Sequence, residues 1–375
     1  MLNRSVCETA PGMPRSRNDN KNGRARATSE GRPISLKELA ARLGLSPATL
    51  SIVLNGSAVA ETIPQETKDR IFEAAKKFNY RPNYIARSLR AQRTYTVGVV
   101  VPELSDGYSA MVLSGVEDHL LKEGFFYFVA SHRHRPELIE RCPQFFLERC
   151  VEGLIAVDTP QRRPSLLPVV SVSGHDNTPG VTNIALNHGR AARLALEHLI
   201  NQGHRRIAVI KGQDFSSDTA ERWSAIRDAA RRLKSPIHPA LVAQLEGDKP
   251  SPETGYVATQ KLLSAGEPFT ALFAFNDISA IGAIRALREA GLRTPEDVSV
   301  IGFDDVHAAA FHNPALTTIR QPLYQMGKLA AEQLLRRIAD GPQARFPELV
   351  TVEPELVIRQ STARAPATSR FSACT

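Results

Sequence analysis

The pattern of hydrophobic and polar positions divides this 375-residue chain into a short helical part and a longer part in which strands and helices alternate. In "SLKELAARLGL" apolar residues recur on one helix face, with Ser35 placed as N-cap and Glu38 completing a capping box. Gly44 is expected to end this helix in a left-handed conformation. A helical pattern resumes almost at once, which predicts two helices joined by a tight turn.

The second helix is predicted to begin at Ser46, which caps it, and Pro47, whose fixed φ suits the first helical position. A third helix is predicted over residues 65–78. A connection of about three to four residues between the first two helices is typical of a helix-turn-helix. Leu50, Val53 and Leu54 are expected to face a small core, which leaves small polar side chains on the open side of the second helix.

After Tyr95 the chain shows buried-strand runs separated by helical segments. The expected strands form a first set at 96–101, 125–131, 153–157 and 168–173, and a second set at 206–211, 241–245, 271–275 and 298–303. One more helix is expected over 323–339, followed by one more strand in "ELVTVEPELVIR". Alternation of strands and helices indicates parallel sheets with crossover helices, so two sets of similar size predict two Rossmann-like lobes.

Positive charge is concentrated in the first quarter of the chain. Between Met1 and Tyr95 there are 17 Lys/Arg and 8 Asp/Glu, a net charge of +9. Residues 96–375 contain 30 Lys/Arg and 31 Asp/Glu, a net charge of −1. A clustered excess of this sign is typical of a protein that binds a polyanion. A solubilising tail is the alternative explanation for the charge of residues 1–32.

The sequence contains no motif of a common enzyme. GxxxxGK[ST], GxGxxG after a strand and GxSxG are all absent, so no catalytic activity is predicted.

No long uncharged apolar run or secretory signal is present, so we expect a soluble, cytoplasmic protein that does not bind membranes. His132 and His134 resemble a metal pair but lack further ligands nearby in sequence, so no metal and no cofactor is expected. Four cysteines without a CxxC pair are expected to be free thiols.

Several motifs together resemble the lac repressor family of bacterial transcription regulators. They are "ISLKELAARLGLSPATLSIVLNG", "IPQETKDRIFEAAKKFNYRPNYIARSLR", "TVGVVVPEL", "ALEHLINQGHRRIAVIKG", "SSDTAERWSAIRDA", "FAFNDISAIGAIRALREAGLRTPEDVSVIGFDD" and "LTTIRQPLYQMGKLAAEQLL". The resemblance covers residues 34–362. It implies an N-terminal all-α helix-turn-helix DNA-binding domain and an α/β core of two Rossmann-like lobes like that of periplasmic binding proteins.

The expected domain organisation therefore has five parts. They are a disordered basic extension at 1–33, the helix-turn-helix domain at 34–79, a hinge helix and linker at 80–95, the two-lobed ligand-binding and dimerisation domain at 96–362, and a disordered tail at 363–375. The tail has no leucine heptads, so a coiled-coil tetramer is not expected.

The resemblance also implies which residues contact DNA. Those on the second helix are Ser46, Pro47, Ala48, Thr49, Ser51, Ile52 and Asn55, of which Pro47, Ala48, Ser51 and Ile52 lie where the family reads bases. Those of the hinge are Asn83, Ala86, Arg87 and Leu89, with Leu89 inserted into a base step of the minor groove. Ile52 stands where most members of the family have Arg, so their operator preference cannot be carried over. An apolar contact with a thymine methyl group is the alternative at that position.

The implied effector site lies between the two lobes, at the ends of the strands. Its residues are Asp106, Tyr108, Arg222, Asn276 and Asp304. Asp106 and Tyr108 fall in "DGYS", where the family usually reads Asn-Pro-Phe-Phe, so the shape of this wall departs from the family pattern.

The predicted function is that of a homodimeric transcription regulator, a repressor, which binds a pseudo-palindromic double-stranded DNA operator. A small-molecule effector, a sugar or a related metabolite, controls that binding. Two alternatives remain at this point: a soluble sugar-binding protein without a regulatory role, and a sugar-metabolising enzyme fused to a DNA-binding module. The basic helix-turn-helix opposes the first alternative, and the absence of catalytic motifs opposes the second.

Overall fold

The computed structural model describes residues 34–81, 88, 92–105, 107–161, 165–175, 178–247, 251–341 and 344–367. The chain forms two compact units, which divide between Arg90 and Ala91, and each is described by itself. Among the described residues, no helix is long and apolar enough to cross a membrane. Cys142 and Cys150 are free thiols, as expected for these two.

The first unit is the predicted three-helix domain. It contains α1 (Leu36–Leu43), α2 (Pro47–Leu54), η1 (Ala58–Thr62) and α3 (Gln65–Lys77), of which only the 3-10 helix η1 was not expected. The capping box is present, because Ser35 N–H donates to Glu38 at 2.8 Å and Glu38 N–H donates to the Ser35 hydroxyl at 3.3 Å. Gly44 has the expected left-handed conformation with φ of 67°. One fully buried side chain from each α-helix forms the centre of the core: Leu39, Leu50 and Ile71.

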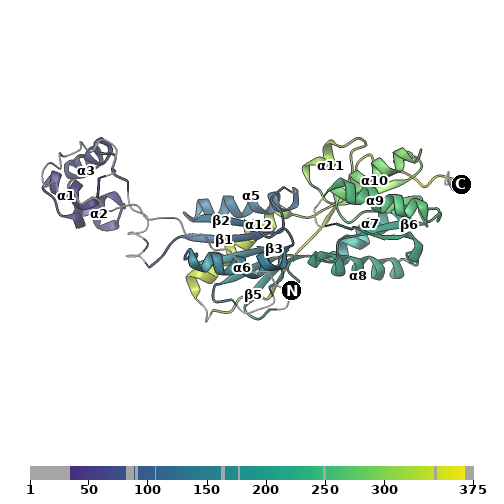
Figure 1. Cartoon of the computed structure of the whole chain (residues 1–375), viewed down its shortest axis with the longest axis horizontal. Coiled ribbons are helices and arrows are strands. Elements are labelled where there is room, and N and C mark those ends of the chain that lie inside the picture. Colours follow the sequence, from purple (N-terminus) through teal and green to yellow (C-terminus); the bar gives the residue numbers. More distant parts are fainter. Residues whose placement is uncertain are drawn as a thin grey trace, which may run out of the picture. The chain divides into compact units, whose positions relative to one another are not determined.

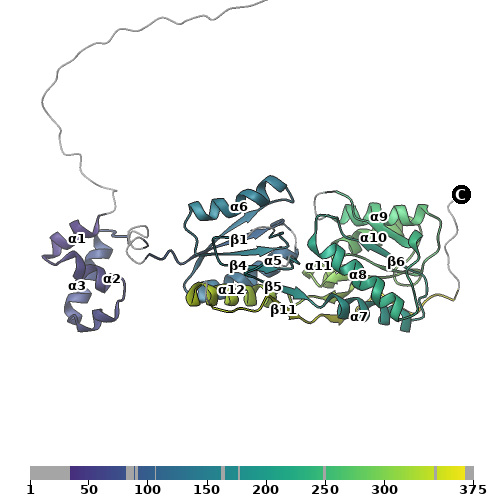
Figure 2. The same ribbon diagram turned by 90° about the horizontal axis from the view of Figure 1, so that it is seen from below.

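The second unit contains two six-stranded sheets, one in each lobe. We call the first sheet and its helices the N-lobe, with strands β1 (Thr96–Val101), β2 (Phe126–Ser131), β3 (Gly153–Val157), β4 (Val169–Val172), β5 (Val181–Leu186) and β11 (Leu349–Val352). Its strands are all parallel and lie in the order β11-β5-β4-β3-β1-β2. Its helices are α5 (Gly107–Lys122), α6 (Pro136–Glu148) and α12 (Leu323–Asp340). Figure 2 shows α6 on one face of this sheet and α12 on the other.

The C-lobe has the second sheet, in the order β12-β10-β9-β8-β6-β7. Its strands are β6 (Ile207–Lys211), β7 (Val242–Gln244), β8 (Ala271–Phe273), β9 (Ser299–Asp304), β10 (Thr317–Arg320) and β12 (Glu355–Val357), and only β12 is antiparallel to its neighbour. Its helices are α7 (His188–Asn201), α8 (Ser217–Arg232), α9 (Pro252–Ser264), α10 (Asp277–Glu289) and the short α11 (His307–Phe311), with a 3-10 turn η2 (Pro239–Leu241). Helices α7 and α8 pack on one face of the sheet and α9 and α10 on the other (Figures 1 and 2).

The prediction of a single strand in "ELVTVEPELVIR" is wrong, because the segment forms two strands: β11 in the N-lobe sheet and β12 in the C-lobe sheet. Pro354 lies between the two strands and has no N–H to continue a ladder of hydrogen bonds. Strand β5 was not predicted, and α12 returns to the N-lobe, where it packs against α5. The chain therefore passes between the lobes three times: after β5, before α12, and between β11 and β12.

Strand β2 is not the buried strand that its apolar sequence suggested. It is the edge strand of the N-lobe sheet, with β1 as its one neighbour. Phe126 is 58% exposed and Phe128 is 41% exposed on it. An apolar run cannot distinguish a strand covered on both faces from an edge strand whose outer side chains are uncovered in a single chain.

A carboxylate anchors the chain where it joins the N-lobe. Glu152, next to β3, accepts a hydrogen bond from the Arg93 guanidinium at 2.8 Å and from the backbone N–H groups of Thr94 and Tyr95 at 2.5 and 2.7 Å. Burial acts to raise the pKa of Glu152, but these three donors outweigh it and hold the pKa below its ordinary value.

A backbone hydrogen bond holds the last described residues of the chain on the C-lobe: Ala365 N–H donates to the Gln202 carbonyl at 2.8 Å.

Candidate functional site: a DNA-reading helix and an interlobe cavity

Helix α2 presents most of its predicted DNA-contacting residues to solvent. Ser46, Pro47, Ala48 and Asn55 are exposed, whereas Thr49 is half-buried. The Ser46 hydroxyl accepts a hydrogen bond from Thr49 N–H at 3.0 Å and lies 2.9 Å from the Thr49 hydroxyl. This cap fixes the first turn, so the exposed residues that follow stand on a rigid helix start.

The other end of α2 is also fixed by its own side chains. Asn55 is the C-cap, and its amide Nδ2 donates to the Ser51 carbonyl at 2.7 Å and to the Ser51 hydroxyl at 3.1 Å. Ser51 and Ile52 are half-buried, so part of each remains accessible on the outer face. The predicted hinge residues lie outside the described residues: Asn83, Ala86, Arg87 and Leu89.

The structure brings four of the predicted effector residues together. Tyr108 of the N-lobe and Arg222, Asn276 and Asp304 of the C-lobe all line one cavity of about 70 Å³, and Asp106 lies outside the described residues. The cavity is completed by residues that the sequence analysis did not name: Pro102, His134, Asp158, Gln213, Phe215, Ser216, Asp218 and Phe275.

Strand ends explain why these residues meet. Asp158 follows β3, Asn276 comes shortly after β8, and Asp304 is the last residue of β9. Parallel strands carry their functional side chains at their carboxyl ends, and here the carboxyl ends of both sheets face the space between the lobes. Asn276 also caps α10 by accepting from Ser279 N–H at 2.9 Å, and Asp304 accepts from the Gln321 amide at 2.7 Å.

Arg222 is a buried residue and not a solvated helix arginine. Its side chain is 4% exposed, and its guanidinium donates to the Phe275 carbonyl at 2.5 Å and to Asp218 Oδ2 at 2.9 Å. The guanidinium carbon lies 3.7 Å from the centre of the Phe303 ring, which adds a cation–π contact. Trp223, which follows it, packs against the core and does not line the cavity.

Two carboxylates that the sequence analysis missed connect the lobes. Asp158 of the N-lobe accepts hydrogen bonds from the Ser217 backbone N–H at 3.1 Å and its hydroxyl at 2.7 Å, at the start of α8. Burial raises the pKa of Asp158 to about 7, and the nearby charge of Asp218 adds to the increase. Asp218 behaves in the opposite way: burial acts to raise its pKa, but His188, His175 and Arg222 hold it well below the ordinary value.

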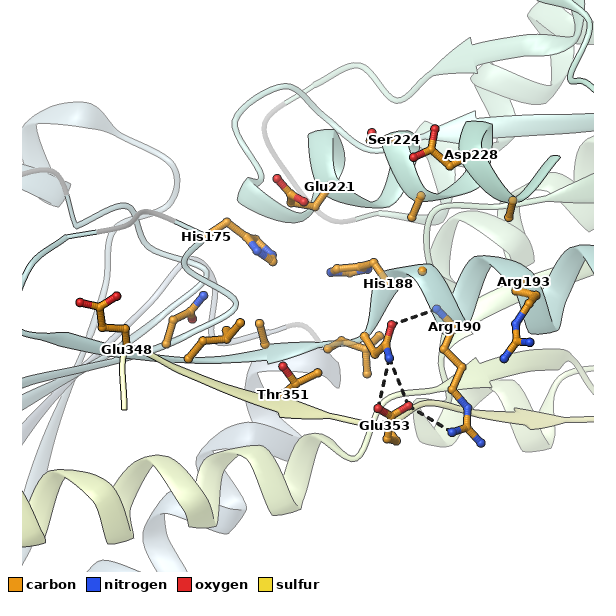
Figure 3. Close-up of a pocket in the computed structure, with 18 of the residues that line it drawn as sticks. His175, His188, Arg190, Arg193, Glu221, Ser224, Asp228, Glu348, Thr351 and Glu353 are labelled. Atoms are coloured by element: carbon orange, nitrogen blue, oxygen red, sulfur yellow. Dashed lines mark hydrogen bonds and ion pairs between the residues drawn. The ribbon is translucent and has the colours of Figure 1, made fainter. Parts of the chain in front are cut away.

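A much larger groove is lined by His175 and His188, both of which contact Asp218. Its volume is about 1310 Å³, and it is bordered by α7, α8 and the strands β5 and β11. Figure 3 shows the imidazoles of His175 and His188 facing each other in this groove, with Glu221 above them. Near one end, Arg190 of α7 pairs with Glu353 at 3.3 Å.

The histidine pair His132 and His134 has structural contacts. His132 is buried and its Nε2 lies 3.0 Å from the Thr159 hydroxyl, while the His134 ring packs at a tilt of 31° on Phe215, with centroids 3.9 Å apart. Burial, with help from His134, lowers the pKa of His132 to about 4, so the ring is neutral near pH 7.

Comparison with known proteins identifies the family of the chain. Residues 35–83 match the model for bacterial regulatory proteins of the lacI family, and residues 196–362 match a periplasmic binding protein-like domain. The HTH-type transcriptional repressor PurR of Haemophilus influenzae is 33% identical over 339 residues, which cover 87% of this chain and 98% of PurR. The chain belongs to the lacI family.

Solved structures of lacI-family proteins have the same fold. The lac repressor dimer bound to operator and the anti-inducer ONPF has a TM-score of 0.78 and 26% identity, with 88% of this chain and 100% of that chain covered. The transcriptional regulator CelR in complex with cellobiose has a TM-score of 0.64 and 29% identity at the same coverage, 88% and 100%. The predicted family and fold class are confirmed. The protein is a lacI-family transcription regulator whose DNA binding responds to an effector, and its relatives are regulators and not enzymes.

Proposed function

We propose that this lacI-family protein represses transcription as a homodimer on a pseudo-palindromic operator, and that a sugar or related metabolite in the interlobe cavity controls the binding. The observation that carries the proposal is the convergence of Tyr108, Arg222, Asn276 and Asp304, from two lobes, on one cavity. Relatives with bound sugars support the effector class: CelR with cellobiose, and a lacI-family regulator of Enterococcus faecium with ribose.

The chemistry of the cavity suits a ligand rich in hydroxyl groups. Hydroxyls both donate and accept, so they can pair with the carboxylates of Asp158 and Asp304 and with the guanidinium of Arg222. The Nε of Arg222 is buried and has no hydrogen-bond partner among the described residues, so a ligand oxygen would satisfy it. The aromatic side chains of Tyr108 and Phe275 offer flat apolar surfaces for the C–H faces of a sugar ring.

The size of the cavity links ligand binding to movement of the lobes. A volume of about 70 Å³ accommodates only a few water molecules, whereas small-molecule pockets typically measure about 300–1,000 Å³. An effector therefore requires the lobes to separate. Separation lengthens the contacts that now join them, including Asp158 to Ser217 at 2.7 Å and His175 to Asp218 at 2.5 Å. The effector thus acts on the lobe arrangement, which is the element that can transmit a signal along the chain.

On the DNA side, α2 is proposed to enter the major groove. Pro47, Ala48, Ser51 and Ile52 would contact base edges, while Ser46, Thr49 and Asn55 would contact the backbone. Small side chains allow a helix to approach the bases closely, and the two end caps of α2 keep their positions fixed. In the hinge, Leu89 would insert into a minor-groove step, Ala86 would allow two hinge helices to approach, and Asn83 and Arg87 would contact phosphates.

Exposed apolar side chains support the homodimer. Phe126 and Phe128 on the edge strand β2 and Leu121 on α5 are 58%, 41% and 53% exposed, and Phe311 on α11 is 88% exposed. Contiguous exposed apolar patches mark interaction sites. The rings of Phe126 and Phe128 lie 5.7 Å apart on β2, and the lac repressor relative was solved as a dimer on its operator. We place the protein in the cytoplasm, where bacterial operator DNA lies.

The experiment combines an effector screen with one pair of variants. Purified full-length protein is tested for thermal stabilisation by sugars and related polyols, and hits are tested for their effect on operator binding. Asp304→Asn should lower the affinity for the stabilising sugar by roughly 10-fold or more, because a charge-assisted hydrogen bond contributes about 1.5–3 kcal/mol. Asp340→Asn, at the exposed end of α12, is the matched control and should leave the affinity unchanged. Equal responses of both variants, or no stabilising sugar, would contradict the site assignment.

A further inference from the structure

Three metal-ligating side chains converge where the N-lobe meets the C-lobe. His175 follows β4 of the N-lobe, His188 is the first residue of α7, and Asp218 lies in the first turn of α8. Both imidazole Nε2 atoms approach the same carboxylate oxygen, Asp218 Oδ1, at 2.5 Å for His175 and 3.3 Å for His188. The three ligand atoms all lie within 4.8 Å of one another, and the side chains of His188 and Asp218 are 7% exposed.

We propose that His175, His188 and Asp218 bind a divalent transition-metal ion of the Zn²⁺ type across the two lobes. Two imidazoles and one carboxylate are a ligand set typical of Zn²⁺ and neighbouring ions such as Co²⁺. Metal–ligand distances of about 2.0–2.2 Å in tetrahedral geometry put ligand atoms about 3.4 Å apart. The separation of His188 Nε2 from Oδ1, 3.3 Å, matches that spacing, whereas that of His175 Nε2, 2.5 Å, must lengthen by about 0.9 Å when an ion enters.

Hydrogen bonds within the protein already direct the three proposed ligand atoms at one another. One carboxylate oxygen, Asp218 Oδ1, is approached by Nε2 of both histidines. Asp218 uses its second oxygen, Oδ2, to hold Arg222 at 2.9 Å, which orients the carboxylate and leaves Oδ1 directed at the histidines. Such an outer contact to a ligating carboxylate is common around metal ions.

Charge and access also suit a cation. The carboxylates of Asp218 and Glu221 act electrostatically on His175, and the guanidinium of Arg222 acts on Asp218, so the two acidic groups outweigh that guanidinium. His175 and His188 line the groove of about 1310 Å³, which gives an ion a path from solvent and room for a further ligand such as water (Figure 3). Because His175 belongs to one lobe and the other two ligands to the other, a bound ion would join the lobes.

The test measures metal binding directly and does not depend on the effector or operator. Untagged full-length protein is freed of metal with a chelator and titrated with Co²⁺, whose visible absorption reports coordination by protein ligands. Zn²⁺ affinity follows from competition with a colorimetric chelator. We expect about one ion per chain. His188→Ala and His175→Asn should each weaken binding by about 100-fold or more, since even outer contacts contribute about 10–100-fold.

His238→Ala is the matched control, because His238 is an exposed histidine elsewhere in the C-lobe, and it should bind metal like the parent. His175→Asn is included because His175 is the least buried of the three ligands, so its replacement disturbs the fold least. Failure of the parent to take up Co²⁺ or Zn²⁺ would overturn the inference. So would metal retained in both His175→Asn and His188→Ala, or lost equally in His238→Ala. None of these outcomes bears on the proposed sugar and operator, which are tested with other variants.

Discussion

Replacing Arg222 tests whether the interlobe cavity is built around a buried ion pair. Arg222→Gln removes the positive charge that Asp218 contacts at 2.9 Å and the guanidinium that lies over Phe303 at 3.7 Å. Removing one partner of a buried ion pair costs about 3–5 kcal/mol, because the other charge stays buried. We expect the lower end, about 3 kcal/mol, since His175 still contacts Asp218. Gln keeps an amide N–H donor, so the substitution removes chiefly the charge and the contact with Phe303.

The assay is urea-induced unfolding of the full chain in the presence of a chelator, followed by far-UV circular dichroism and by the fluorescence of the single tryptophan. Trp223 is adjacent to Arg222 in α8 and packs on the core, so its emission reports unfolding of the C-lobe. Arg231→Gln is the control on the same helix. Its side chain is 74% exposed and pairs with Asp228 three residues earlier, so its loss should cost under about 1 kcal/mol.

A double-mutant cycle with Asp218→Asn separates the pair from general disruption. Because the double variant leaves no unpaired charge between these two positions, it should be less destabilised than the two single variants added together, by about 0.5–3 kcal/mol. The reasoning would be refuted if Arg222→Gln unfolded within about 0.5 kcal/mol of the parent, as an ordinary surface substitution does. Strict additivity in the cycle would refute the ion pair in particular.

Three further predictions concern pH and DNA. Burial raises the pKa of Asp158 to about 7, so the folded state retains a proton that the unfolded chain releases near pH 4. Asp158 therefore lowers the free energy of unfolding as pH rises between those two values. At a pH above about 7, Asp158→Asn should unfold at a higher urea concentration than the parent, whereas at about pH 4 the two midpoints should coincide. Equal shifts of the midpoint at the two pH values would contradict this prediction. Leu89→Ala should weaken operator binding by about a few kcal/mol and non-specific binding hardly at all, and equal losses in gel shifts would exclude a wedge. Operator affinity should fall about 10³–10⁵-fold between 50 and 200 mM salt if about 6–10 phosphates are contacted; a flat response would contradict an electrostatic interface.

The helix-turn-helix could be predicted in detail because its signals are local. Ser35, Glu38, Gly44 and Ser46 act on backbone groups within a few residues, and each forms the predicted cap or left-handed turn. The residues between Ser57 and Ile63 formed an unexpected 3-10 helix, since their pattern contains no clear cap or apolar period. Local hydrogen-bonding chemistry is visible in a sequence, whereas weakly specified segments are shaped by the elements that flank them.

Much of the larger unit could be placed from strand–helix alternation, but not the course of its last segment. The sequence "ELVTVEPELVIR" contains strand formers on both sides of Pro354, and only tertiary packing decides that they join different sheets. The same limit applies to the exposed Phe126 and Phe128, because apolar composition does not show which strand lies at an edge. Strand membership and edges depend on contacts between distant residues.

The side chains around Asp218 were missed for a related reason. Asp218 lies 43 residues from His175 and 30 residues from His188 along the chain, so no motif spacing connects them. Each is unremarkable alone: a histidine in a loop, a histidine starting a helix, and an acid in a first helical turn. The resemblance to relatives found Arg222, Asn276 and Asp304, because those positions recur in the family pattern, but it gave no reason to consider Asp158 or Asp218.

Five residues at strand ends near the interlobe cavity have a backbone conformation with positive φ. Asp158, Ser173, His175, Asp304 and Asp305 have φ of 38°, 55°, 49°, 105° and 59°, and all lie at or just after the carboxyl ends of β3, β4 and β9. Such conformations cost about 1–3 kcal/mol each and persist only where surrounding contacts fix them. Here some of those contacts join the lobes, as Asp158 does with Ser217 at 2.7 Å. Under the proposed lobe separation these contacts would lengthen, so the free-energy difference between closed and open lobes would include the loss of the hydrogen bonds from Ser217 to Asp158.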